Sequence, residues 1–187
     1  MDNAGEGMAW FAMSAPFCKE LDAKRFLDKR QIESYIPMCY KVLVKNNKKI
    51  RELVPAIHNL VFVKTTRNII QETKRCVSFL QYITKTEAGR RIPIIVPDWQ
   101  MQQFIAISQT YDEHLVYLTP DEINLKKGTP IRILGGPFDG VEGFFVKIKG
   151  CRSKRVVVFI QGIIAVAMTE VQPDLIEIIS PDKMIKL

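Results

Sequence analysis

Over the first hundred residues, apolar and polar positions follow two periods, one typical of strands and one typical of helices. Residues 8–14, MAWFAMS, supply apolar side chains to both faces of a predicted strand. Segment 17–31 contains no helix breaker, and Ala23, Phe26 and Leu27 share one helical face. The remaining elements expected here are extended segments at 32–44, 60–64 and 77–83, a short helix at 68–75 and a helix capped by Asp98. This order predicts a mixed α+β sheet covered by helices.

The pattern changes after a polar stretch at about residues 112–123, which we expect to be a linker. Five strand-like runs follow at short spacing: TPIRIL, VEGFFVKI, RVVVFI, GIIAVAM and DLIEII. Such spacing is typical of a small all-β barrel. The sequence therefore predicts two domains, residues 1–118 and residues 122–187.

A glycine-rich segment, ILGGPFDGVEGFF at 133–145, lies between two of these runs. A phosphate-binding loop would need GxxxxGK[ST], but Val141 and Glu142 stand where lysine and a hydroxyl are required. Glycines before and after Pro137 can adopt positive φ, and Asp139-Gly140 is a strong turn dipeptide. We therefore expect a structural turn, with the key positions Gly136, Pro137, Phe138, Gly140 and Gly143.

The net charge of +7 is concentrated in two segments. The first contains Lys41, Lys45, Lys48, Lys49 and Arg51 and spans the turn-forming NNKK sequence. The second covers residues 147–155. Clustered cations favour a polyanionic partner, because they release counterions from phosphates. The alternative is that each segment is a solvated hairpin tip.

Other chemistry has little support in the sequence. The four cysteines form no CxxC pair, and with only two histidines the usual zinc spacings are missing, so we expect no metal, no cofactor and no catalytic residue. Unpaired thiols are typical of a cytoplasmic protein. No apolar run approaches the roughly 20 residues that span a bilayer.

The segment KGTPIRILGGPFDGVEGFFVKIKGCRSKRVVVFI, residues 127–160, resembles the KOW motif of NusG-type transcription factors. Three N-terminal segments, WFAMSA, VPAIHNLVFVKT and RIPIIVPDWQMQQF, resemble the NusG N-terminal (NGN) domain in the same order. The resemblance covers about residues 8–180. It implies an NGN domain followed by an SH3-like KOW barrel.

The resemblance implies a factor that is not an enzyme and that binds the clamp helices of RNA polymerase to support elongation. Carried over by position, the apolar contact surface would include Trp10, Ile57 and Leu60. The alternative for these three residues is an ordinary core position. The first basic segment would lie near non-template DNA.

The chain departs from housekeeping NusG in two segments. His58 and Asn59 stand where the family has proline and glycine, and Gln161-Gly162-Ile163 loses the residues that help contact ribosomal protein S10 or Rho. The sequence therefore resembles a specialised paralogue of the RfaH or UpxY kind, which regulates particular operons, and UpxY is the more similar. An RNA-binding or ribosome-binding protein with a KOW domain is the alternative.

Overall fold

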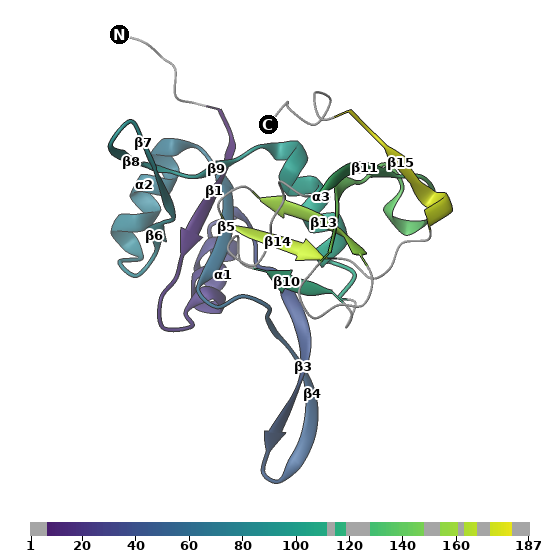
Figure 1. The fold of residues 1–187 in the computed structure, drawn as a ribbon. Coiled ribbons are helices and arrows are strands. Elements are labelled where there is room, and N and C mark those ends of the chain that lie inside the picture. The colour runs from purple at the N-terminus through teal and green to yellow at the C-terminus, as the bar shows by residue number, and fades with distance from the viewer. Residues whose placement is uncertain are drawn as a thin grey trace. The chain divides into compact units, whose positions relative to one another are not determined.

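A computed structural model describes residues 7–111, 115–118, 128–147, 154–160, 163–167 and 173–180 (Figure 1). The chain divides into two compact units, residues 1–101 and 102–187. This division falls within helix α3, Asp98–Ser108. The expected linker lies mainly at residues outside the described ranges, whereas Val116–Leu118, which we placed within it, forms a strand of the second sheet.

The first unit is built on an antiparallel sheet with β1 (Ala9–Ser14) and β5 (Leu60–Thr65) at its centre. The sheet order is β2-β5-β1-β6, and β9 also pairs with β1. The three shorter strands are β2 (Glu33–Tyr35), β6 (Gln81–Tyr82) and β9 (Ile95–Val96). The predicted strands at 8–14 and 60–64 are confirmed, while the one at 77–83 is reduced to two residues.

Both faces of the central strands are buried. Phe11 and Val63 belong to a core that also contains Leu27 of α1 (Glu20–Lys29) and Ile70 of α2 (Arg67–Cys76). The opposite face carries Trp10, Ala12, Leu60 and Phe62, all of which are buried as well. The continuous apolar runs in β1 and β5 reflect this double burial, because an alternating pattern would leave one face to solvent.

The starts of α1 and α2 have different causes. Thr66 caps α2 by accepting a hydrogen bond from Ile69 N–H at 3.4 Å. Helix α1 begins at Glu20, later than the start of the breaker-free segment, because Phe17 and Cys18 have positive φ values of 63° and 55°. Left-handed residues cannot continue a right-handed helix.

Two separate hairpins complete the first unit. The long one pairs β3 (Met38–Lys45) with β4 (Lys48–Pro55) and projects away from the sheet (Figure 1). The short one pairs β7 (Thr84–Glu87) with β8 (Arg90–Pro93) around Ala88 and Gly89, both at positive φ. The short hairpin was not predicted, since its strands are almost wholly polar.

The second unit contains a six-stranded antiparallel sheet of order β10-β14-β13-β12-β11-β15. Its strands are β10 (Val116–Leu118), β11 (Thr129–Ile133), β12 (Glu142–Lys147), β13 (Lys154–Ile160), β14 (Ile164–Ala167) and β15 (Ile176–Ile178). Short 3-10 helices occur at Gly136–Phe138 and Pro173–Leu175. All five predicted strands are confirmed. Within the described ranges no pairing of β10 with β15 closes the sheet, so a closed barrel stays a prediction.

Candidate functional site

The long β3–β4 hairpin, called the basic arm below, presents the first cationic segment to solvent. Eight consecutive residue pairs join its strands, from Met38 and Pro55 at the base to Lys45 and Lys48 at the tip. Asn46 and Asn47 form the turn with φ of 51° and 59°. Two positive φ values are typical of a type I′ turn, whose twist matches that of the flanking strands. The NNKK sequence therefore fixes both the turn and the register of the arm.

The register divides the five predicted cations between two faces of the arm. Side chains alternate along a strand, so Lys41, Lys45 and Lys48 project on one side and Lys49 and Arg51 on the other. Val42 and Val44 lie on the second face and are 64% and 69% exposed. The arm thus combines cations with uncovered apolar side chains, and its basic segment is not a single flat patch.

Some of these charges already have partners in the arm. Lys45 Nζ lies 2.5 Å from Glu52 Oε2, and the Arg51 guanidinium stacks 4.2 Å from the centre of the Tyr40 ring. Among the described residues, no carboxylate lies within ion-pair distance of Lys41, Lys48 or Lys49. These three ammonium groups are therefore available to an external anion.

A second cluster joins the first strand to the start of α3. Trp10 Nε1 donates a hydrogen bond to Asp98 Oδ1 at 3.2 Å, and Lys64 Nζ lies 2.8 Å from the same oxygen. The hydrogen bond to Asp98 raises the pKa of Lys64 above its usual value. Desolvation lowers this pKa, and the negative charges of Asp98 and Glu33 raise it further. Asp98 is the first residue of α3, where a carboxylate also opposes the positive end of the helix dipole.

The three predicted polymerase-contact residues differ in exposure. Trp10 and Leu60 are each only 3% exposed, whereas Ile57 is half-buried. Trp10 and Leu60 are thus buried in this structure, and Ile57 is the most accessible of the three. A role of the three residues in binding stays a prediction.

Asn59 explains how the chain accommodates a departure from the family's Pro-Gly sequence. Its φ of 67° lies in the left-handed region that glycine would otherwise occupy. Asparagine tolerates this region better than most residues. Its carbonyl accepts a hydrogen bond from Ala15 N–H at 2.8 Å, and its side chain accepts one from Cys18 N–H at 3.2 Å. The backbone shape is thus retained with a different side chain.

The glycine-rich segment forms the predicted turn. Gly135, Gly136 and Gly140 have φ of 80°, 72° and 79°. Asp139 has φ −52° and ψ 133°, and Val141 N–H donates to the Phe138 carbonyl at 3.1 Å. These values describe a type II turn with Gly140 at its third position. Phe138 is half-buried, and Pro137 is the second residue of the 3-10 helix.

Gly143 is needed for a different reason, because the backbones of β12 and β13 lie close together at this position. A Cβ added there would lie 2.7 Å from the Val157 carbonyl oxygen of β13. Gly143 lies within β12 rather than in the turn, and the backbone of β13 leaves no room there for a Cβ.

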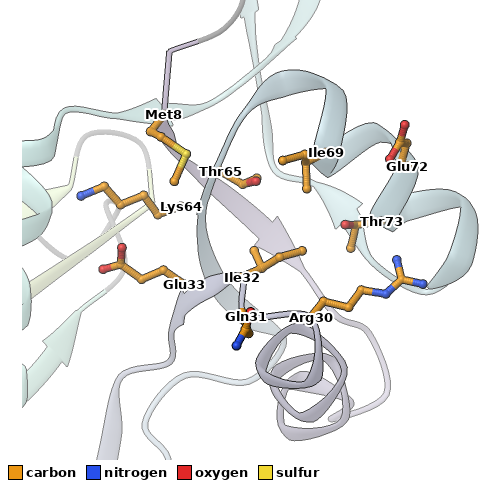
Figure 2. A pocket seen from close by; sticks show the side chains of 10 residues that line it. All are labelled: Met8, Arg30, Gln31, Ile32, Glu33, Lys64, Thr65, Ile69, Glu72 and Thr73. Atoms are coloured by element: carbon orange, nitrogen blue, oxygen red, sulfur yellow. The ribbon is translucent and has the colours of Figure 1, made fainter.

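A groove of about 520 Å³ also opens in the first unit, between the end of α1, β5 and α2. Figure 2 shows Lys64 and Glu33 at one end, Ile32 and Ile69 along it and Arg30 toward the other end. Charges of both signs line it, so it has no bias toward anions or cations. None of the residues predicted from the sequence contributes to this groove.

The comparisons with known proteins identify the family. A family model described as NusG, transcription termination factor, matches residues 8–105, more than half of the chain. Thirteen solved chains are similar, among them one titled "Domain interaction in Thermotoga maritima NusG", with 16% identity and a TM-score of 0.43 over 93% of this chain and 98% of that one. No curated protein matches closely enough to count as a relative. Within the described residues, no helix is long and apolar enough to cross a membrane. The chain belongs to the NusG family of transcription factors.

Proposed function

We propose that the protein binds RNA polymerase and increases the processivity of transcription as an operon-specific elongation or antitermination factor. The observation that carries this proposal is the NusG family match, which spans the first sheet, its helices and the basic arm. The factor would act by binding alone, without making or breaking a bond.

The polymerase clamp helices are the proposed partner of the first unit. In this proposal Ile57 lies at the accessible edge of the contact, while Trp10 and Leu60 form its buried floor.

The basic arm is the proposed contact with non-template DNA. Its support is physical: the arm projects from the sheet and carries Lys41, Lys48 and Lys49 without carboxylate partners among the described residues. Ammonium groups on such an arm can approach phosphates at little desolvation cost, because they remain in water.

The second unit is proposed to be a KOW barrel that serves as a tethered adaptor. The turn at Gly136, Pro137, Phe138 and Gly140 supports this proposal, since these residues carry the KOW resemblance. Contacts with ribosomal protein S10 or Rho are not part of the proposal, because the residues that make them are replaced. The resulting combination fits a specialised paralogue of the UpxY or RfaH kind.

Transcription in vitro on a template with a pause and a terminator tests the function. The full chain should shorten the pause and increase read-through. A variant with Lys45, Lys48 and Lys49 changed to glutamate should lose most of this effect. The matched control changes Lys85, Arg90 and Arg91 of the short hairpin to glutamate, with the same change in charge, and should keep it.

Equal activity of the two triple variants would contradict the role of the arm. An inactive wild-type chain that binds ribosomes or RNA, but not polymerase, would contradict the proposal as a whole.

A further inference from the structure

Three potential metal ligands meet at one end of the central strands of the first sheet, although they are separated in the sequence. They are Cys18, Glu20 and His58, and their ligand atoms all lie within 4.8 Å of one another. Cys18 Sγ is 3.9 Å from His58 Nδ1, which is 3.8 Å from Glu20 Oε1. A thiol, an imidazole and a carboxylate therefore converge on one point.

Two loops are held together to create this arrangement. Asn59 accepts hydrogen bonds from the backbone N–H groups of Ala15 and Cys18, which joins the loop before α1 to the loop before β5. Cys18 and Asn59 both adopt positive φ, at 55° and 67°. The backbone thus keeps Cys18 and His58 on facing loops, and their side chains make only a long sulfur–nitrogen contact of 3.9 Å.

Glu20 supplies an independent reason to expect a cation here. The residue is only 1% exposed, and its Oε2 atom has no hydrogen-bond partner among the residues that the structure describes. A buried carboxylate that lacks compensation is costly, and it is normally paired or bound to a metal. The start of α1 offers partial compensation through the helix dipole, and His58 lies beyond hydrogen-bond distance of Oε1. The carboxylate is thus buried beside two ligands and incompletely satisfied.

We infer that Cys18, Glu20 and His58 form a binding site for Zn²⁺, with a fourth coordination position open to water or to a group from a partner. Tetrahedral zinc places a sulfur about 3.6 Å from a nitrogen, and a nitrogen about 3.4 Å from an oxygen, given its usual bond lengths. These two observed separations exceed the ideal values by a few tenths of an ångström, and the sulfur and the carboxylate oxygen lie within 4.8 Å of each other. Cys18 and His58 are exposed and can close that difference. Mixed sulfur, nitrogen and oxygen ligands suit zinc better than Mg²⁺ or Ca²⁺, which prefer oxygen alone.

The site was not expected from the sequence. Cys18 and Glu20 stand two residues apart, but His58 comes from a distant loop, and this spacing matches no common zinc motif. The positive φ values of the two loops bring the three residues together, and these are features of the fold.

Calorimetric titration of the full, tag-free, reduced chain with Zn²⁺ tests the inference. One zinc should bind per chain, and Cys18→Ser or His58→Ala should each weaken the affinity by at least about tenfold. Both side chains are exposed, so these variants should still fold. The matched control is Cys76→Ser, which removes another exposed free thiol and should bind zinc like the wild type.

Cobalt provides a spectroscopic check on the ligands. Co²⁺ bound by the wild type should give a thiolate charge-transfer band in the near ultraviolet, and Cys18→Ser should lose it while Cys76→Ser keeps it. Sedimentation should show a monomer-sized complex at all metal ratios. Metal that instead joins two chains would overturn the site.

Glu20→Gln separates metal binding from folding. Without metal this variant should melt at or above the wild-type temperature, because it removes a buried charge that lacks compensation. Zinc should raise the melting temperature of the wild type but not that of the variant. Equal zinc stabilisation of both proteins, or a metal-free variant that melts well below the wild type, would overturn the argument.

Discussion

Trp10 and Asp98 are joined by a hydrogen bond of 3.2 Å, from the indole N–H to Oδ1, across 88 positions of sequence. The same oxygen also contacts Lys64 Nζ at 2.8 Å, and that ammonium lies 5.6 Å from the centre of the Trp10 ring. One carboxylate therefore satisfies a buried donor of β1 and pairs with a cation of β5. This shared acceptor ties the start of α3 to the centre of the first sheet.

Removal of the Asp98 carboxylate should lower the stability of the folded protein. We expect Asp98→Leu to destabilise the protein by about 1–3 kcal/mol, because the buried indole N–H would lose its acceptor. Asp98→Asn keeps an acceptor and should lose less. Thermal unfolding measures the difference, and Trp10 emission in a Trp99→Phe background reports on its surroundings. Asp28→Leu, which removes an exposed helix pair with Lys24, should cost less than about 0.5 kcal/mol. Equal losses for Asp28→Leu and Asp98→Leu would contradict this prediction.

Stability at alkaline pH should depend on Lys64. Its pKa in the folded protein is raised above 10.5, mainly by the hydrogen bond to Asp98. The stabilising contribution is therefore fully present below the unfolded pKa and is lost as pH rises through the folded value. Denaturant unfolding between about pH 9 and about pH 12, where lysine titrates, should show a steeper decline for the wild type than for Lys64→Met. Parallel pH profiles would show that the pair does not contribute.

Gly143→Ala should destabilise the second sheet. The new Cβ would meet the Val157 carbonyl oxygen at 2.7 Å, and both groups belong to paired strands that cannot easily separate. Overpacking of this kind typically costs about 1–3 kcal/mol. Gly7→Ala is the control, since nothing lies within 4 Å of its added Cβ. Denaturant unfolding of both variants makes the comparison, and an unchanged Gly143→Ala protein would show that β12 and β13 are not packed as described.

The salt dependence of DNA binding should report the cations of the basic arm. The glutamate variant at Lys45, Lys48 and Lys49 should reduce the slope of log affinity against log salt by up to about 2.7 for duplex DNA, at about 0.9 for each phosphate that is no longer neutralised. Fluorescence anisotropy at several salt concentrations measures this slope. The triple glutamate variant of the short hairpin should retain the wild-type slope. A similar reduction in both variants would indicate a response to net charge alone.

Much of the fold could be predicted because its signals are local. The apolar runs of β1 and β5, the helix-forming segments and the turn residues at Asn46-Asn47 and Asp139-Gly140 each act over a few positions. The start of α1 was less predictable, because the positive φ of Phe17 and Cys18 has no strong signal in either side chain. The β7–β8 hairpin was missed since its pairing involves almost no burial.

The candidate sites were likewise predictable where their signals are local in the sequence, and not where they depend on the fold. The basic arm was predicted because its charges and its turn lie together in the sequence. The burial of Trp10 and Leu60 could not be predicted, because a family resemblance assigns a position to each residue but does not say which residues cover it. Glu20 shows the same limit, since its burial depends on loops that meet only in the folded chain.

The register of the basic arm restricts how its length can change in evolution. Adding one residue to each strand would move every side chain beyond the insertion to the opposite face, because the strand period is two. An arm that keeps the same side chains on each face can therefore lengthen or shorten only in steps of two residues per strand. Each step changes the length of the arm by about 7 Å. Paralogues that extend to different depths should then differ in hairpin length by multiples of four residues.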